Sequence, residues 1–272
     1  MECPTYFNWR YGRALIQYLD PTANVSMISR KWCWVDFGKQ FKYLRKKVEN
    51  YFENAITGNP AYAAFHMVQY CGSNQKWAKK IIETAICDNM LKNVLSTVQY
   101  MVICDDSNRQ WAENLVEKAT IDDPSNTAIH LVNHFGSDPM WAKKIIENDI
   151  IGDAAYASFQ MVSEFKLKPQ WAEKIIENAT TGTPAFVAYK MVSFHGSDRQ
   201  WAERIIENCK IEDPAYAAFR IAKDCGSDLE WAKKIIENIR VGNPRYSAFL
   251  MVSRYNFDLK WAENIKDYSK GE

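Results

Sequence analysis

The side chains of this sequence that could bind a metal ion are four histidines, at positions 66, 130, 134 and 195. His130 and His134 stand four residues apart, a spacing that places both imidazoles on one face of a helix and lets them share one metal ion. No third ligand accompanies the pair, so the sequence predicts no metal site and no cofactor. The neighbouring acids Asp105 and Asp106 fall at a predicted turn, where we interpret them as helix caps.

Recognised catalytic motifs are missing from the sequence, which has no glycine-rich phosphate loop, no GxSxG, no HExxH and no calcium loop. The repeated acids fall at capping or surface-pairing positions, so none is singled out as a general acid, base or nucleophile. We therefore predict no catalytic residue, and an activity without a local motif stays open. The seven cysteines are scattered and form no CxxC pair, which favours reduced thiols and a cytoplasmic location.

Composition narrows the class of protein further. The chain has 272 residues, 47% hydrophobic and 25% charged, with 34 basic against 33 acidic side chains and a net charge of +1. These values are typical of a globular protein, and near-neutrality argues against overall electrostatic attraction to nucleic acid or to an anionic membrane. No apolar run approaches the roughly 20 residues that span a bilayer, and the first residues lack the pattern of a secretory signal. We expect no membrane partner.

A repeat in the sequence predicts the elements that position these side chains. Trp-Ala occurs at 77, 111, 141, 171, 201, 231 and 261, with a first spacing of 34 residues and then five of 30. With each Trp as position 1, a unit without the Trp also fits at 47–76. The sequence therefore predicts a domain of repeats over 47–272, with units starting at 47, 77, 111, 141, 171, 201 and 231 and a half unit at 261–272.

Each unit predicts two helices. In the first helix, positions 1, 2, 5, 6 and 9 are apolar, which makes one buried stripe of period near 3.6. An aspartate at position 28, such as Asp198 or Asp228, is expected to cap the first helix that follows. In the second helix, position 13 carries a capping residue, position 14 is mostly proline and position 26 is mostly glycine, which ends the helix in a left-handed conformation.

Two departures from the period lead to separate expectations. Units 141 and 231 carry Lys166 and Asn256 at position 26 instead of glycine, so their turns are expected to differ from the others. The unit at 77 has four extra residues, and Met101-Val102 keep their places when counted back from Trp111. We expect the four residues to lengthen the second helix by about one turn.

A 30-residue helix pair cannot bury its own apolar stripes, so the units must stack on one another. The pattern of an aliphatic first helix, an Asp-Pro opening and a Gly-x-Asp closing resembles the short HEAT-like repeats over residues 47–272. The Trp-Ala pair and the Tyr-Ala-Ala-Phe core depart from the usual HEAT pattern. The resemblance and the period predict an all-α, right-handed α-solenoid of about seven repeats with N- and C-terminal caps and with second helices on the inner face.

Differences among the units indicate where a partner would bind. Position 4 is mostly Lys or Arg and position 7 is Glu throughout the first helices, which we interpret as pairs along a solvated helix face. Positions 20 and 24 of the second helix are expected to be exposed, and they vary from unit to unit, as on the binding surface of a repeat scaffold. This stripe predicts binding of a protein or peptide through Tyr70, Tyr100, His130, His134, Lys190, Phe194, Arg220 and Arg254.

Residues 1–46 form a separate segment with 10 of the 37 aromatic residues, and residues 1–50 hold nine basic and four acidic side chains. One interpretation is an N-terminal cap or degenerate repeat that covers the first unit. The alternative is a platform for single-stranded nucleic acid, in which rings stack on bases and cations neutralise phosphates. In that alternative the contacts would come from Trp32, Trp34, Arg45, Lys46 and Lys47.

Overall fold

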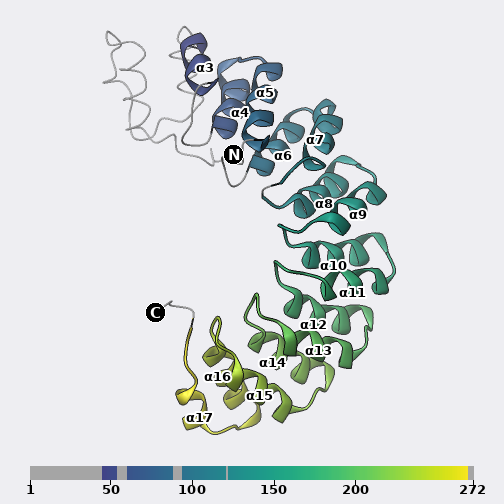
Figure 1. Cartoon of the computed structure of the whole chain (residues 1–272), viewed down its shortest axis with the longest axis vertical. Helices are drawn as coiled ribbons and strands as arrows, with labels where there is room; N and C mark the ends of the chain where they lie inside the picture. The colour runs from purple at the N-terminus through teal and green to yellow at the C-terminus, as the bar shows by residue number, and fades with distance from the viewer. Residues whose placement is uncertain (1–44, 54–59, 88–93, 121, 269–272) are drawn as a thin grey trace, which may run out of the picture. The chain divides into compact units, whose positions relative to one another are not determined.

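The computed structural model describes residues 45–53, 60–87, 94–120 and 122–268, and within these ranges the chain is all-α with no strand. The helices are α3 (Arg45–Glu53), α4 (Pro60–Cys71), α5 (Gln75–Cys87), α6 (Val94–Cys104), the short 3-10 helix η3 (Asp106–Asn108), α7 (Arg109–Val116), α8 (Pro124–Phe135), α9 (Pro139–Asn148), α10 (Ala154–Phe165), α11 (Pro169–Glu177), α12 (Pro184–His195), α13 (Arg199–Asn208), α14 (Ala215–Cys225), α15 (Leu229–Asn238), α16 (Pro244–Tyr255) and α17 (Leu259–Asn264) (Figure 1). None of these helices is long and apolar enough to cross a bilayer.

The chain divides into two compact units, residues 1–122 and 123–272. In unit 1, α4 packs against α3, α5 and α6, and α6 packs against α7. The segment 1–46 predicted as a cap lies almost wholly outside the described residues, which begin at Arg45.

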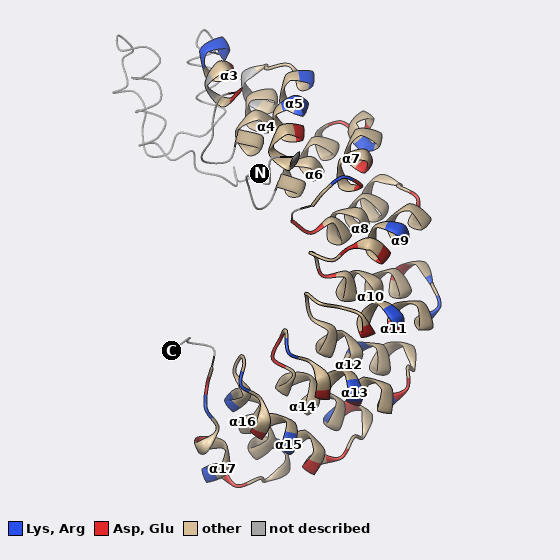
Figure 2. Ribbon diagram, in the orientation of Figure 1, with Lys and Arg blue, Asp and Glu red and all other residues tan. Residues whose placement is uncertain are grey.

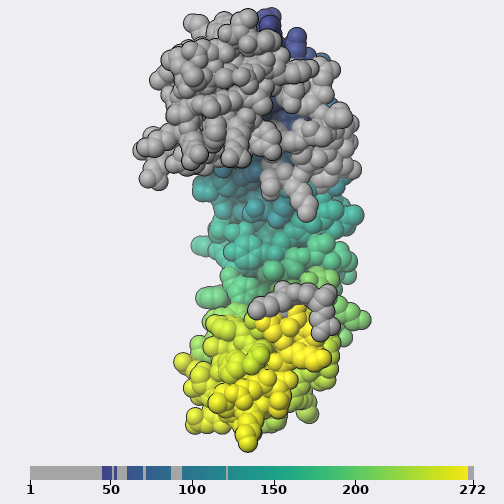
Figure 3. Space-filling model, turned by 90° about the vertical axis from the view of Figure 1, so that its left-hand side faces the viewer, coloured from purple at the N-terminus to yellow at the C-terminus, as the bar shows by residue number. Residues whose placement is uncertain are grey.

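Unit 2 is a two-layer array of helix pairs. The second helices α8, α10, α12, α14 and α16 contact one another in chain order, and each first helix from α9 to α15 packs on the second helices before and after it. Within this unit, Figure 1 shows the second helices forming one layer and the first helices the other. The space-filling view changes colour steadily along the unit, as expected when successive layers stack in order (Figure 3).

The core of unit 2 comes from small and branched side chains at fixed repeat positions. Ala172 and Ile176 of α11 have exposed fractions of 0% and 1%, and Ala202 and Ile206 of α13 both have 0%. Alanine at these places allows close approach of neighbouring helices, while isoleucine fills the space between layers. The predicted apolar stripe of the first helix is confirmed in its most buried members.

An unforeseen hydrogen bond ties successive first helices together at six places within the two units. The indole N–H of the Trp at position 1 donates to the carboxylate of the Glu at position 7 one repeat earlier. The donor–acceptor distances are 2.6–2.8 Å for the pairs Trp77–Glu53, Trp111–Glu83, Trp171–Glu147, Trp201–Glu177, Trp231–Glu207 and Trp261–Glu237. The Glu at position 7 thus bonds to the next repeat. An ion pair along its own helix also occurs, between Lys143 and Glu147 at 3.8 Å.

The predicted caps are largely confirmed. Asp138, Asp198, Asp228 and Asp258 each accept a backbone hydrogen bond at the start of a first helix. At the second helices, Asp123, Asp153 and Asn243 do the same.

Thr183 is the exception, because it makes no side-chain cap and instead donates its hydroxyl to Asp153. The carboxylate of Glu212, from the next repeat, accepts the N–H groups of Ala185 and Phe186 in its place.

The expectation that the turns differ in the units without glycine at position 26 holds for their hydrogen bonds, because the N–H of Gly196 bonds to the carbonyl of Met191, five residues back, whereas the N–H of Asn256 bonds to that of Val252, four residues back. For the backbone conformation the expectation was wrong. Lys166 and Asn256 adopt the same left-handed conformation, with φ of 54° and 57°, as Gly196 and Gly226 with φ of 68° and 75°. Both residues adopt it in spite of the strain of about 1 kcal/mol that a Cβ atom causes in this conformation.

The expectation of a longer second helix after Trp77 falls on residues outside the described part of the chain. The described part of α6 has 11 residues, and its counterparts in unit 2 have 11 or 12. Val94 occupies position 14 when counted back from Trp111, so the four extra residues precede it and fall in 88–93, outside the described residues.

Candidate functional site

The predicted stripe divides into an exposed and a half-buried row. At position 24, His134, Phe194 and Arg254 are exposed, and Phe194 has an exposed fraction of 68%. At position 20, His130, Lys190 and Arg220 are half-buried. Position 20 is therefore less accessible than the sequence indicated, because neighbouring second helices lie against it.

In unit 1 the side chains at positions 20 and 24 do not divide in this way between exposed and half-buried. Tyr100 of α6 is 46% exposed and stacks on Phe65 of α4 with ring centroids 5.6 Å apart. His66, at position 20 of α4, is buried, and burial lowers its pKa to about 4. Tyr70 lies in α4, but its side chain is outside what the structure describes.

Aromatic rings at positions 16 and 19, which the sequence predicts as the Tyr and Phe of the Tyr-Ala-Ala-Phe core, underlie the stripe in unit 2. We call this set the aromatic row; it consists of Tyr156, Phe159, Phe186, Tyr189, Tyr216, Phe219, Tyr246 and Phe249. Neighbouring rings from Phe186 to Tyr246 have centroids 6.0–6.4 Å apart, within the range of favourable aromatic pairs. Tyr246 is 56% and Phe249 is 37% exposed, so the row reaches the surface at α16.

Lys190 lies above three of these rings. Its ammonium nitrogen is 5.3 Å from the ring centroid of Tyr156, 5.0 Å from that of Phe159 and 5.0 Å from that of Phe186. These distances fall within the reach of cation–π attraction. Among the ion pairs of the described residues, none involves Lys190. The rings hold the ammonium group in place and leave it without a carboxylate.

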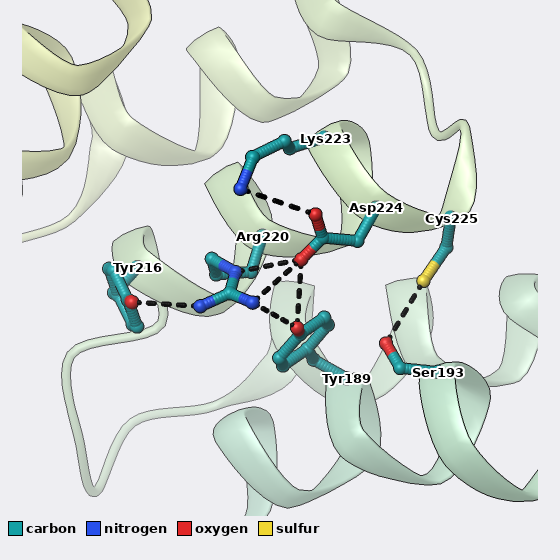
Figure 4. A network of polar contacts seen from close by, with 7 residues as sticks. All are labelled: Tyr189, Ser193, Tyr216, Arg220, Lys223, Asp224 and Cys225. Carbon is teal, nitrogen blue, oxygen red and sulfur yellow. Dashed lines mark hydrogen bonds and ion pairs between the residues drawn. The ribbon is translucent and has the colours of Figure 1, made fainter.

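Arg220, one repeat later, is engaged on every side (Figure 4). Its Nε donates to Asp224 at 2.8 Å, and its two terminal nitrogens donate to the hydroxyls of Tyr216 at 3.1 Å and Tyr189 at 2.6 Å. Tyr189 in turn donates to Asp224 at 2.8 Å. Burial raises the pKa of Tyr189, and the bond to Asp224 acts in the same direction. Arg220 thus links α12 to α14 and is less available to a partner than its exposed position suggested.

The histidine pair lies on one face, as its spacing predicted. The ring centroids of His130 and His134 are 4.5 Å apart, and burial lowers the pKa of His130, with a further contribution from His134. No group of three metal-binding side chains occurs among the residues that the structure describes.

Only some of the residues assigned to nucleic-acid binding belong to the described part of the chain. Trp32 and Trp34 lie outside the described residues, and Arg45, Lys46 and Lys47 lie in the first turn of α3. Arg45 donates to the carbonyl of Gly72 at 2.8 Å and lies 3.7 Å from Glu49. Arg199 makes the equivalent bond to Gly226, so Arg45 follows a structural pattern of the repeat.

Charge is distributed unevenly between the two layers of unit 2. Figure 2 shows α8, α10 and α12 almost without charged residues, in agreement with their sequences, whereas α9, α11, α13 and α15 each carry both signs. These three second helices therefore present rings with two charged side chains, Glu164 and Lys190. Comparison with protein-family models, curated proteins and solved structures finds no match for this chain.

Proposed function

We propose that the chain is a non-catalytic scaffold that binds a protein or peptide along the exposed face of its second helices. The observation that carries this proposal is the side chain of Phe194, which is 68% exposed beside the half-buried ring of Phe159, 6.3 Å away. An exposed ring next to an aromatic row has no role in solubility, and such patches commonly mark interaction sites. Rigid second helices would present these rings at low entropic cost.

The same proposal includes the architecture that such a scaffold requires, a right-handed α-solenoid of about seven HEAT-like repeats with second helices on its inner face. Its support is the recurrence of the Trp–Glu bonds and of the left-handed turns from one repeat to the next. The described thiols Cys104, Cys209 and Cys225 are free, which agrees with the cytoplasmic location proposed for the scaffold.

Site-specific photo-crosslinking tests the binding function. A benzoylphenylalanine placed at position 194 of α12 is compared in the native cell with one at position 174 of α11, where Lys174 is also exposed but lies in the other layer. We expect an adduct of discrete mass from position 194 and none from position 174. Equal adducts from both positions, or none from position 194, contradict the proposal. A nuclease-sensitive adduct would instead support the nucleic-acid alternative.

A further inference from the structure

Lys190 and Arg220 occupy the same place, position 20, in consecutive second helices, yet their surroundings differ in one respect. Four residues after Arg220 stands Asp224, whose carboxylate lies 2.8 Å from the guanidinium. Four residues after Lys190 stands Phe194, which is exposed and carries no charge. The repeat therefore supplies a carboxylate to the cation of α14 and omits it in α12.

The ammonium group of Lys190 is preorganised for an anion. It has three N–H donors, and three rings restrict its position at 5.0–5.3 Å. Ring faces attract a cation but satisfy its donors poorly, so an added carboxylate would gain charge-assisted hydrogen bonds. The Lys190 side chain is half-buried, so part of its surface remains in contact with solvent.

The surrounding layer has a surplus of positive charge. The basic side chains of the second helices in unit 2 are Lys190, Arg220, Lys223, Arg245 and Arg254, against two acids, Glu164 and Asp224. Both acids are already engaged, because Glu164 accepts a hydrogen bond from Asn133 and Asp224 pairs with Arg220. An incoming carboxylate at Lys190 would therefore meet attraction from this layer.

We propose that Lys190 binds a carboxylate of an extended acidic peptide, in the place that Asp224 takes beside Arg220, while Phe194 and Phe159 pack against a neighbouring apolar residue of that peptide. This inference rests on the proposed scaffold function and names the chemistry of its partner. Helix layers about 8–10 Å apart and about 3.3 Å per extended residue mean that about nine residues extend over about three layer spacings, that is, over four second helices.

A continuous polyanion fits this surface less well than a peptide with separated acids. Helices α8 and α10 contain no Lys or Arg. The loops that lead into α8 and α10 carry Asp123, Asp149 and Asp153, which would repel a phosphate backbone. A peptide can direct one carboxylate to Lys190 and keep the rest of its length apolar or neutral.

Fluorescence anisotropy with two labelled nine-residue peptides tests this proposal. Both peptides alternate Gln with Leu, and one of them carries Glu instead of Gln at its central polar position. We expect the full-length protein to bind the Glu peptide about tenfold more tightly, which is the ratio expected for one charge-assisted pair. Lys190→Gln should remove this preference, and Lys190→Arg should keep it. Phe194→Asp, which supplies the carboxylate within α12, should also remove it, while the helical circular dichroism stays unchanged.

The outcomes separate this inference from the function on which it rests. Equal binding of both peptides that is lost in Phe194→Ala would overturn the role of Lys190 and leave the scaffold function standing. Absence of binding by either peptide would overturn the acidic partner, while cross-linking from position 194 judges the scaffold function independently. Tighter binding of an oligothymidylate of nine nucleotides, with affinity falling steeply with salt, would overturn it in favour of nucleic acid.

Discussion

The indole N–H of Trp201 donates a 2.8 Å hydrogen bond to the carboxylate of Glu177, one repeat earlier. Trp201 is only 6% exposed, so its polar atom needs a partner when the layers stack. The equivalent bond recurs along the array, as between Trp171 and Glu147. In that pair a lysine at position 3 of the earlier repeat also lies over the indole, with the ammonium of Lys143 5.6 Å from the ring centroid of Trp171. Stacking of the first helices is thus specified by a polar contact at the edge of the apolar core.

We expect Glu177→Ala to lower the free energy of unfolding by about 1–2 kcal/mol, because it leaves the buried indole N–H of Trp201 without an acceptor. Glu177→Gln keeps a carbonyl acceptor and should lose less than half of that amount. Urea unfolding followed by circular dichroism measures both changes. The matched control is Glu230→Ala, whose side chain is 65% exposed and forms a surface ion pair with Lys233 at 3.6 Å, and which should change stability by less than about 0.5 kcal/mol.

Glu212 predicts a dependence of stability on pH. Burial raises its pKa from 4.5 to about 7, in spite of the hydrogen bonds from Phe186 and Ala185. The folded protein therefore holds a proton that the unfolded chain releases, so this contribution to stability is complete below pH 4.5 and is lost as the pH rises through 7. The loss is on the order of 3 kcal/mol.

The comparison that checks this contribution is Glu212→Gln, which cannot titrate. Unfolding free energies of the two proteins should converge near pH 4.5, and the natural protein should become relatively less stable toward about pH 8. A difference that stays constant over this range would show that Glu212 titrates normally. Asp123 and Asp213, whose pKa values burial also raises, are present in both proteins and do not affect the difference.

The glycine at position 12 has a steric role that substitution can expose. Gly182 has φ of 78°, and a Cβ atom there would overlap the carboxylate of Asp153, the cap of the preceding repeat. Gly196 has a similar φ of 68°, but a methyl group added there would meet no atom within 4 Å. We expect Gly196→Ala to cost about 1 kcal/mol from the backbone alone and Gly182→Ala to cost at least about 2 kcal/mol more. Equal melting temperatures of the two variants would contradict the steric role.

Much of the helix architecture could be predicted from the sequence, because its signals are local. The period of the Trp residues fixes the helix pairs, and a capping residue such as Asp198 marks a helix start through its own backbone neighbours. The left-handed turn at Lys166 was not predicted, because local preference disfavours this conformation for a residue with a Cβ atom.

The surface was harder to predict for the same physical reason. Arg220 was placed correctly on the second helix, but its bond to Tyr189 joins residues that are 31 positions apart. The rings beneath the stripe did leave a signal in the sequence. Aromatic residues recur every 30 residues at Tyr156, Phe186, Tyr216 and Tyr246, and this recurrence could have indicated the aromatic row.

The last prediction separates residues of the stripe that stabilise the fold from those available to a partner. Arg220→Ala removes a guanidinium that bonds Asp224, Tyr189 and Tyr216, and it leaves the carboxylate of Asp224 with Lys223 as its remaining cation. Burial opposes ionisation of Asp224, but the bonds from Tyr189 and Arg220 outweigh it and lower its pKa. We expect a loss of about 2–3 kcal/mol in unfolding free energy.

Two further variants complete this comparison. Lys223→Ala removes one contact of 3.4 Å to Asp224 and should cost less than about 1 kcal/mol. Phe194→Ala removes a ring that is 68% exposed, so the unfolding free energy of this variant should change by less than about 1 kcal/mol. Cross-linking of the partner from positions next to 194 should become weaker. Differential scanning calorimetry of the three variants ranks their losses of stability. If Phe194→Ala lowers the melting temperature as much as Arg220→Ala does, the ring stabilises the contact between α10 and α12, and its assignment to partner binding is wrong.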